Sequence, residues 1–254
     1  MASVELVIPV LNEEHALPGC LDSLREFLME HLQEHRWQIV IVDNGSTDGT
    51  LQVAQCYAER YPQEVRYLHM EARGRGRALK RAWTDMEADL AAYMDVDLST
   101  GLDALPELVN AIAHDGYHIA YGSRLAKTSR TTRGLKREVI SQGYNLLVKW
   151  VMRTSFSDAQ CGFKAISKSA ARVLMPVIIN NNWFFDTEML VIAEKRGFRI
   201  KEVPVAWSDD PDSRVKIFRT AMEDIQGLAR LRLGGVPEVI PPENGAPTTK
   251  HNAD

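Results

Sequence analysis

The sequence predicts an α/β fold in which a Rossmann-like, mostly parallel central sheet is flanked by helices. Two observations carry this prediction. Short apolar runs alternate with segments of helical periodicity, which is the order expected of β-α-β units. The chain has 254 residues, of which 45% are hydrophobic, and this suits one large domain with a full core.

The apolar runs predict the strands. We expect strands at 4–10, 37–43, 65–70, 90–95 and 117–122, with strand-like pieces at 162–167 and 198–207. Between the first two strands, leucines recur every three or four residues from Leu17 to Leu32, which indicates the buried stripe of an amphipathic helix. Further helices are expected near 50–60, 77–87, 103–114, 134–153, 168–175, 184–196 and 215–232.

The remaining composition bears on organisation and location. We expect one domain over 1–235, followed by a flexible tail over 236–254 that is rich in proline and polar residues. The net charge of −4 offers no bulk attraction to nucleic acid, so no nucleic-acid partner is expected. Three cysteines without a C-x-x-C pair argue for a reducing compartment. With no signal peptide and no apolar run near the roughly 18 residues of a membrane span, we expect a cytoplasmic chain.

The stretch AAYMDVDLST places two carboxylates, Asp95 and Asp97, at the end of an apolar run. In an extended segment both would point to the same side, within reach of one cation. Two anions held that close need a partner, and a divalent metal with oxygen ligands supplies one. The plainer alternative is a strand followed by a polar turn. The pair alone therefore fits either a metal site or a polar turn.

Polar segments follow each of the first five expected strands. They read PVLNEE, DNGSTDGT, EARGRGRAL, DVDLST and GSR. Because ligands of open parallel sheets bind beyond the carboxyl ends of the strands, these segments should meet in one place. Together they supply carboxylates, free backbone N–H groups and arginines. This combination favours a metal-bound diphosphate as the ligand.

These segments, in this order, resemble the family 2 glycosyltransferases, most closely the polyprenyl-phosphate (dolichyl-phosphate) glucose and mannose synthases. The resemblance runs from about Val4 to Val215 and rests on VIPVLNEE, IVIVDNGSTDGT, GRGRA, YMDVDLST, YGSR, REVISQG, DAQCGFK, FFDTEML and EVPVAWSDDPDSRV. It implies the GT-A fold, with a nucleotide-binding half over about 1–123 and an acceptor-binding half over about 124–235. The expected activity is that of an inverting, metal-dependent hexosyltransferase.

The resemblance also implies residue roles in the donor half. The expected nucleotide-binding residues are Pro9, Leu11, Glu13, Asp43, Ser46, Gly74, Arg75 and Asp95. Gly76 would let the backbone approach the nucleotide beside Arg75. Asp95 and Asp97 resemble the D-x-D pair that bridges Mg²⁺ or Mn²⁺ to the diphosphate, with Asp97 in the catalytic set. Such a metal stabilises the charge that builds on the departing diphosphate.

The second half would bind the acceptor. Between Arg124 and Arg153 there are eight basic residues and one acid, Glu138, which indicates either a solvated helix face or a site for a lipid phosphate near an acidic membrane. In the family pattern, the positions that bind the acceptor phosphate are Arg124, Arg137, Ser141 and Arg214.

The choice of acceptor decides whether a base is needed. A phosphate acceptor is already ionised near neutral pH and needs no general base. A hydroxyl acceptor would need one, and the candidates are Asp186 and Glu188, followed by Asp158. In the alternative reading, these acids orient the acceptor arginines or cap the helix that begins near Asp186.

Several alternatives stay open. Ser99 stands where mannose-type relatives tend to carry glutamine, so UDP-glucose is favoured as donor, with a GDP-hexose as the alternative. The same fold transferring sugar to a hydroxyl of a soluble or glycan acceptor is the second hypothesis. The third is a non-catalytic subunit that binds a nucleotide sugar in a membrane complex. The helix around 214–233 either rests on a membrane surface, on the cytoplasmic face, or packs against its own domain.

Overall fold

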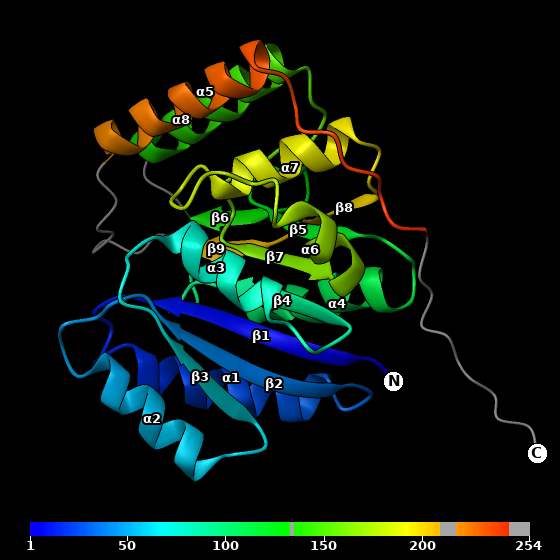
Figure 1. The fold of residues 1–254 in the computed structure, drawn as a ribbon. Helices are drawn as coiled ribbons and strands as arrows, with labels where there is room; N and C mark the ends of the chain where they lie inside the picture. Colours follow the sequence, from blue (N-terminus) through cyan, green and yellow to red (C-terminus); the bar gives the residue numbers. More distant parts are fainter. Residues whose placement is uncertain (133–134, 209–216, 244–254) are drawn as a thin grey trace, which may run out of the picture.

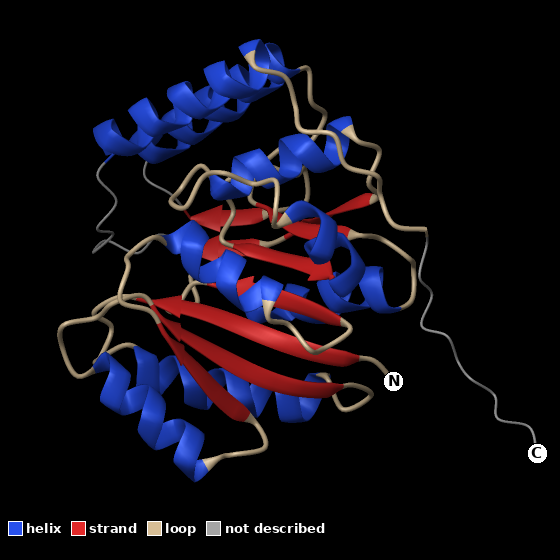
Figure 2. Ribbon diagram, viewed as in Figure 1, coloured by secondary structure: helices blue, strands red, loops and turns tan. Residues whose placement is uncertain are grey.

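A seven-stranded sheet forms the centre of the computed structural model, which describes residues 1–132, 135–208 and 217–243 (Figures 1 and 2). The strand order is β3-β2-β1-β4-β7-β5-β8. The strands are β1 Ser3–Val10, β2 Arg36–Asp43, β3 Val65–His69, β4 Leu90–Met94, β5 Ile119–Ser123, β7 Phe163–Ser167 and β8 Ile200–Pro204. Only β7 among these seven runs antiparallel to its neighbours, so the predicted mostly parallel sheet is confirmed.

A small second sheet pairs β6 Arg130–Thr132 with β9 Ala206–Ser208. The sequence pattern predicts neither β6 nor the break between β8 and β9, because it treats 198–207 as one apolar run. The break falls after Pro204, which has no N–H to continue the ladder of hydrogen bonds. Val205 then donates its N–H to the Ser123 carbonyl, and the chain leaves the main sheet.

Helices cover both faces of the central sheet. Their bounds are α1 Leu17–His31, α2 Thr50–Arg60, α3 Arg75–Thr84, α4 Leu105–Ala113, α5 Leu135–Met152, α6 Lys168–Leu174, α7 Phe185–Lys195 and α8 Ile217–Leu233, with a short 3₁₀ helix at Leu102–Ala104. One hydrophobic cluster packs α1, α2 and α4 against one face, and a second packs α3, α6 and α7 against the other. Helices α5 and α8 lie side by side outside α7 as an outer layer (Figure 1). In the part of the chain that the structure describes, no helix combines the length and the apolar character of a membrane span.

The polar segment after β4 differs from the expected extended geometry. The strand ends at Met94, and Leu98 donates its N–H to the Asp95 carbonyl at 3.2 Å, which closes a turn. Leu98 has φ of 49°, in the left-handed region. The alternation of a strand therefore does not extend to Asp97, and the same-side argument for the two carboxylates was wrong.

The segment after α8 makes contacts with the domain that the sequence pattern does not predict. The Arg196 guanidinium donates to the Pro237 carbonyl at 2.7 Å, and a His118 ring nitrogen lies 3.1 Å from the Pro242 carbonyl. Val236 and Val239 pack against the core. Residues 236–243 thus run along the body of the protein, and the rest of the predicted tail, 244–254, lies outside the described residues.

The outer layer depends on close contact at Gly227 of α8. A Cβ there would come within 2.3 Å of the buried Phe184 ring, which precedes α7. We predict that Gly227→Ala lowers the free energy of unfolding by roughly 1–3 kcal/mol, because the added methyl group would overlap a buried, close-packed ring that has no room to move. Denaturant unfolding measures this change.

Gly143→Ala in α5 is the matched control, because a Cβ there has no neighbour within 4 Å. It should be neutral or stabilise the fold by up to about 1 kcal/mol through helix propensity. Equal stability of the two variants would contradict the packing of α8 described above.

Candidate active site

The carboxyl edge of the sheet brings the polar segments together, as expected. Strands β1 and β2 end in register, Val10 beside Asp43, and the antiparallel β7 begins beside the end of β4 through Met94 and Phe163. The segment that leads into β7 therefore meets the carboxyl ends of the parallel strands. The acids of DAQCGFK and DVDLST thus share one edge.

Arg75, the first residue of α3, joins two carboxylates from distant parts of the chain. Its guanidinium donates to Asp95 Oδ1 and to Asp186 Oδ2, each at 2.7 Å, and lies 5.1 Å from the ring centres of both Tyr93 and Trp183. Burial lowers the pKa of Arg75, but the charge of Asp95 and its other neighbours outweighs burial and holds the pKa well above its usual value. Arg75 is therefore a fixed cation at the carboxyl edge.

Asp186 is the most heavily paired acid of the site. It is buried, receives a hydrogen bond from the Tyr93 hydroxyl, and lies 3.0 Å from the Lys164 ammonium, which is itself fully buried. Burial raises the pKa of Asp186, but Lys164 and Arg75 outweigh it, so the pKa lies below the usual range. An ionised carboxylate with a lowered pKa is a poor proton acceptor near neutral pH.

Glu188 is held from three sides. Its carboxylate accepts the N–H groups of Ile179 and Asn180 at 3.1 and 2.9 Å, and it pairs with Arg230 of α8 at 2.9 Å. The side chain is completely buried. Glu188 therefore ties the loop before α7 and the outer helix α8 to α7.

The glycines of GRGRA accommodate this loop. Gly74 has φ of 151°, and a Cβ there would come within 2.5 Å of the Asn181 carbonyl. At Gly76 a Cβ would come within 2.6 Å of Phe185 and 2.8 Å of the Asn182 carbonyl. In this structure the two glycines are required by the 181–182 loop and α7, a constraint that the expected nucleotide approach did not include.

The loops after β1 and β2 are bonded to each other. Asp43 is completely buried, lies 2.6 Å from His69 through Oδ2, and accepts the Ser46 N–H through Oδ1 at 3.2 Å. The Ser46 hydroxyl in turn accepts the N–H of Asn12 at 2.9 Å. The expected nucleobase residues Pro9, Leu11 and Glu13 are half-buried on and beside the same loop.

The D-x-D pair presents oxygen donors of different exposure. The Asp95 side chain is 44% exposed and lies where a Cβ at Gly162 would be 1.8 Å from its Oδ2, so only glycine leaves room for it. Asp97 is exposed, and its Oδ1 accepts the Ser99 N–H at 2.9 Å. No group of three histidine, cysteine or acidic side chains that could hold a metal occurs among the described residues. Two carboxylates fit Mg²⁺ or Mn²⁺, whose other ligands would be phosphate and water.

Arg124 follows β5 and forms a bidentate pair with the buried Asp158. The Nε and Nη2 atoms donate to the two carboxylate oxygens at 2.6 and 2.8 Å, and the Arg124 N–H donates at 3.1 Å. Burial raises the pKa of Asp158, and Arg124 outweighs it to lower the pKa below the usual range. Ser141 lies half-buried in α5, whereas the Arg137 side chain and Arg214 lie outside what the structure describes.

Sequence reasoning missed Tyr93, Lys164 and Asp224. The sequence does contain one signal for Lys164. A lysine in the apolar strand FKAIS would be buried, and a buried lysine needs an anionic partner. Asp224 of α8 gave no such signal. It is 3% exposed, its Oδ2 accepts from Gln160 at 3.0 Å, and its Oδ1 has no hydrogen-bond partner in the described part of the chain. Burial, with a smaller effect of Glu223, raises the pKa of Asp224 to about 7.

Comparison with known proteins gives a consistent set of relatives. A sequence model described as Glycosyl transferase family 2 matches residues 5–175. Glycosyltransferase AglD of Haloferax volcanii is 36% identical over 226 residues, which cover 89% of this chain but 35% of AglD. Dolichyl-phosphate beta-glucosyltransferase ALG5C of Trichomonas vaginalis is 31% identical over 241 residues, covering 90% of this chain and 71% of the relative. The Saccharomyces cerevisiae dolichyl-phosphate beta-glucosyltransferase is 27% identical, with coverages of 91% and 74%.

Solved structures resemble the fold. The crystal structure of glucosyl-3-phosphoglycerate synthase from Mycobacterium tuberculosis with uridine diphosphate gives a TM-score of 0.65 at 20% identity, over 93% of this chain and 82% of that chain. The same synthase with Mn²⁺, uridine diphosphate and glucosyl-3-phosphoglycerate gives 0.64 at 18% identity, with coverages of 93% and 81%. This likeness confirms the GT-A fold that the sequence predicts.

We predict that Asp224 makes stability depend on pH. Because its pKa is raised from about 4 in the unfolded chain to about 7, its stabilising effect is complete below pH 4 and is lost as the pH rises through 7. Asp224→Asn removes the titration. Between pH 4 and pH 8, the difference in unfolding free energy between this variant and wild type should shift in favour of the variant by roughly 1–3 kcal/mol.

Thermal melts of both proteins from pH 4 to pH 8 measure this difference. Glu223→Gln serves as control, since the neighbouring acid contributes only a minor part of the shift. Parallel stability curves for wild type and Asp224→Asn would contradict a raised pKa at Asp224.

Proposed function

The chain belongs to glycosyl transferase family 2, and on this premise we propose that it is an inverting, metal-dependent enzyme that moves a hexose from a nucleotide sugar onto a polyprenyl or dolichyl phosphate. The observation that carries the proposal is the state of the acids at the carboxyl edge. Asp186 and Glu188 are both buried and ion-paired, which leaves neither of them free to act as a base. An acceptor that arrives ionised fits such a site.

The donor is proposed to be UDP-glucose. Support comes from Ser99 after the D-x-D pair and from the names of the dolichyl-phosphate beta-glucosyltransferases among the relatives. The donor site would comprise the linked loops around Asp43 and Ser46, together with Pro9, Leu11 and Glu13. Arg75 would hold Asp95 in place beside the diphosphate.

Asp95 and Asp97 would hold Mg²⁺ or Mn²⁺. When bound, this ion would stabilise the charge that develops on the departing diphosphate. The fixed positive charge of Arg75 lies next to Asp95 and would favour an anionic ligand at the same place. Crystal structures of the synthase with the same fold contain Mn²⁺ or Mg²⁺ with uridine diphosphate, which agrees with an oxygen-ligated divalent ion.

The acceptor phosphate would be bound by arginines of the second half. Arg124 is fixed by Asp158 at the end of β5, beside the start of β7. Arg137, Ser141 and Arg214 complete the set that the family resemblance implies. A phosphate with its second pKa near 6 is largely dianionic at neutral pH, so its oxygen can attack the sugar without losing a proton to the protein.

Asp186 and Glu188 then receive positioning roles. Asp186 would fix Arg75 and, through it, Asp95. Glu188 would fix the 179–180 loop that packs against α3. This division agrees with the lowered pKa of Asp186, which keeps the acid ionised and bonded across the neutral range.

The proposed acceptor brings the enzyme to a membrane surface. With its three cysteines unpaired, we place it in a reducing compartment, on the cytoplasmic face. Transfer to a hydroxyl remains the second hypothesis, and a non-catalytic nucleotide-sugar-binding subunit the third. Both are distinguished from the first by the variants below.

We predict that Asp97→Asn lowers the rate of UDP release from UDP-glucose by at least about 100-fold, because one of the two metal-binding carboxylates is lost. The fold should persist, since Asp97 is exposed. Asp103→Asn, an exposed acid of the 3₁₀ helix, is the control and should retain full activity. Rates are measured with saturating Mg²⁺ and dolichyl phosphate, with UDP-glucose and GDP-mannose as alternative donors.

Full activity of Asp97→Asn at wild-type metal concentration would remove the metal assignment. Faster release of GDP from GDP-mannose than of UDP from UDP-glucose would change the proposed donor to GDP-mannose. The proposed transferase activity would stand. Donor binding without release, for every acceptor tried, would favour the non-catalytic subunit.

Glu188→Gln separates a positioning role from a base. Loss of the ion pair with Arg230 and of the charge that accepts two N–H groups should lower the unfolding free energy by roughly 1–3 kcal/mol. Activity per folded molecule with dolichyl phosphate should fall less than about 10-fold and keep its pH profile. A 1,000-fold loss at unchanged thermal stability, with the acidic limb of the pH profile removed, would instead identify a base and a hydroxyl acceptor.

A further inference from the structure

The outer layer of α5 and α8 presents apolar side chains outward. In α5 the exposed ones are Ile140, Leu146, Leu147 and Trp150, and Trp150 is 80% exposed. They recur at the three-to-four spacing of one helix face, with Gly143 between them. Asn145 and Val148, by contrast, face the protein and are buried.

Helix α8 repeats this arrangement. Met222, Ile225 and Leu233 are 46%, 52% and 86% exposed. On the opposite side Leu228 and Leu231 are buried. Both helices thus bury one apolar side and expose another, whereas a surface helix of a globular protein normally shows water a polar face.

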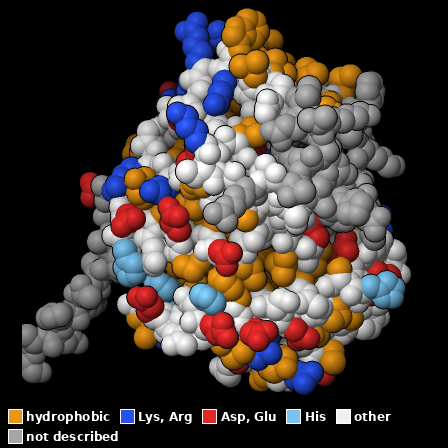
Figure 3. Space-filling model, turned by 180° about the vertical axis from the view of Figure 1, so that it is seen from behind, with side chains coloured by type: hydrophobic (Ala, Val, Ile, Leu, Met, Phe, Trp, Pro, Cys, Tyr) orange, Lys and Arg blue, Asp and Glu red, His pale blue; other side chains and the backbone are white. Residues whose placement is uncertain are grey.

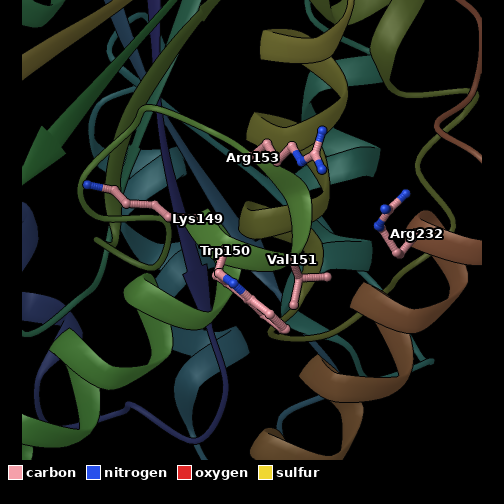
Figure 4. Close-up of a pocket in the computed structure, with 5 residues that line it drawn as sticks. All are labelled: Lys149, Trp150, Val151, Arg153 and Arg232. Atoms are coloured by element: carbon pink, nitrogen blue, oxygen red, sulfur yellow. The ribbon is translucent and has the colours of Figure 1, made fainter.

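The exposed charged side chains described at one end of this layer are basic. Lys149, Arg153 and Arg232 lie around the carboxyl-terminal ends of the two helices, where they line a hollow of about 480 Å³ with Trp150 (Figure 4). Among the side chains of α5 and α8 that the structure describes, no acid is exposed. Seen from behind, apolar and basic side chains occupy the same upper end of the molecule (Figure 3).

We propose that this surface, the α5–α8 face, docks on an anionic phospholipid membrane. It comprises Ile140, Leu146, Leu147, Trp150, Met222, Ile225 and Leu233, with Lys149, Arg153 and Arg232 at its rim. Apolar side chains would enter the acyl boundary, Trp150 would lie at the headgroup level, and the long basic side chains would reach the lipid phosphates.

The charge pattern favours a membrane over a second copy of the chain. A two-fold contact through this face would bring its cations against their own copies, with no exposed acid among the described side chains of α5 and α8 to offset them. An anionic membrane offers the opposite charge, and each lysine or arginine near such a surface adds to the attraction.

Docking here would also orient the candidate active site. Helix α8 is joined to α7 by the Arg230–Glu188 pair, and α5 by the hydrogen bond between the Tyr144 and Thr187 hydroxyls at 2.8 Å. Asp186 and its partner Arg75 are therefore linked to the docked layer through α7. This orientation rests on the proposed lipid acceptor, whereas the docking itself does not.

Sedimentation with phospholipid vesicles tests the docking. The full chain should bind vesicles of phosphatidylcholine with about one-third phosphatidylglycerol, and bind pure phosphatidylcholine at least about 10-fold more weakly. The double variant Leu146→Gln/Trp150→Gln should lose at least about 10-fold in affinity for the anionic vesicles. Met29→Gln, which removes an exposed apolar side chain of α1, should bind like wild type.

Arg153→Ala/Arg232→Ala separates the charges from the apolar face. It should weaken binding to anionic vesicles and leave the weak binding to neutral vesicles unchanged. UDP release with a short, water-soluble isoprenyl phosphate should match wild type in both double variants, because none of the four residues belongs to the proposed site.

Several results would overturn the docking. One is equal vesicle binding by wild type and Leu146→Gln/Trp150→Gln. Another is a concentration-dependent dimer in light scattering that this variant makes monomeric, which would assign the face to a second copy. If no lipid phosphate accepts sugar while variant-sensitive vesicle binding persists, the proposed function fails and the docking stands.

Discussion

The ion pairs of Arg75 with Asp95 and Asp186 join the start of α3, the turn after β4 and the first turn of α7. Removing one partner from such a buried pair leaves an uncompensated charge, which typically costs roughly 3–5 kcal/mol. Lys164 and the Tyr93 hydroxyl complete the environment of Asp186. One guanidinium therefore links segments that are far apart in the sequence, and it fixes Asp95, one of the two acids proposed to hold the metal.

Glycines make this arrangement sterically feasible. Gly162 leaves space for the Asp95 carboxylate, while Gly74 and Gly76 leave space for the 181–182 loop. The two residues before this loop donate their N–H groups to Glu188. Each glycine marks a close approach of backbone to another group rather than a flexible hinge. Asp186 and Glu188 thus shape the neighbouring segments through their ion pairs and hydrogen bonds. Under the proposed function, these two carboxylates of FFDTEML position other groups and move no proton.

Apolar periodicity in the sequence predicted the seven strands of the main sheet and every long helix to within a few residues. It did not predict the strand order, which depends on pairing between distant segments. It could not predict the turn at Asp95–Leu98, because strand alternation fails where one residue takes a left-handed φ. Pairings such as Lys164 with Asp186 depend on tertiary contact. Periodicity also groups Ile225 with Leu228, yet only packing shows that Ile225 is exposed and Leu228 buried.

The central claim is that an already ionised acceptor replaces a catalytic base. Its most direct test compares dolichyl phosphate with dolichol, the same lipid without phosphate, as acceptor for UDP-glucose from pH 5 to pH 9 with Mg²⁺ present. We expect transfer only to the phosphate, with a rate that rises through pH 6 and then stays level, since the titrating group is the acceptor itself. Comparable transfer to dolichol, or an apparent pKa that does not follow the acceptor, would contradict the claim.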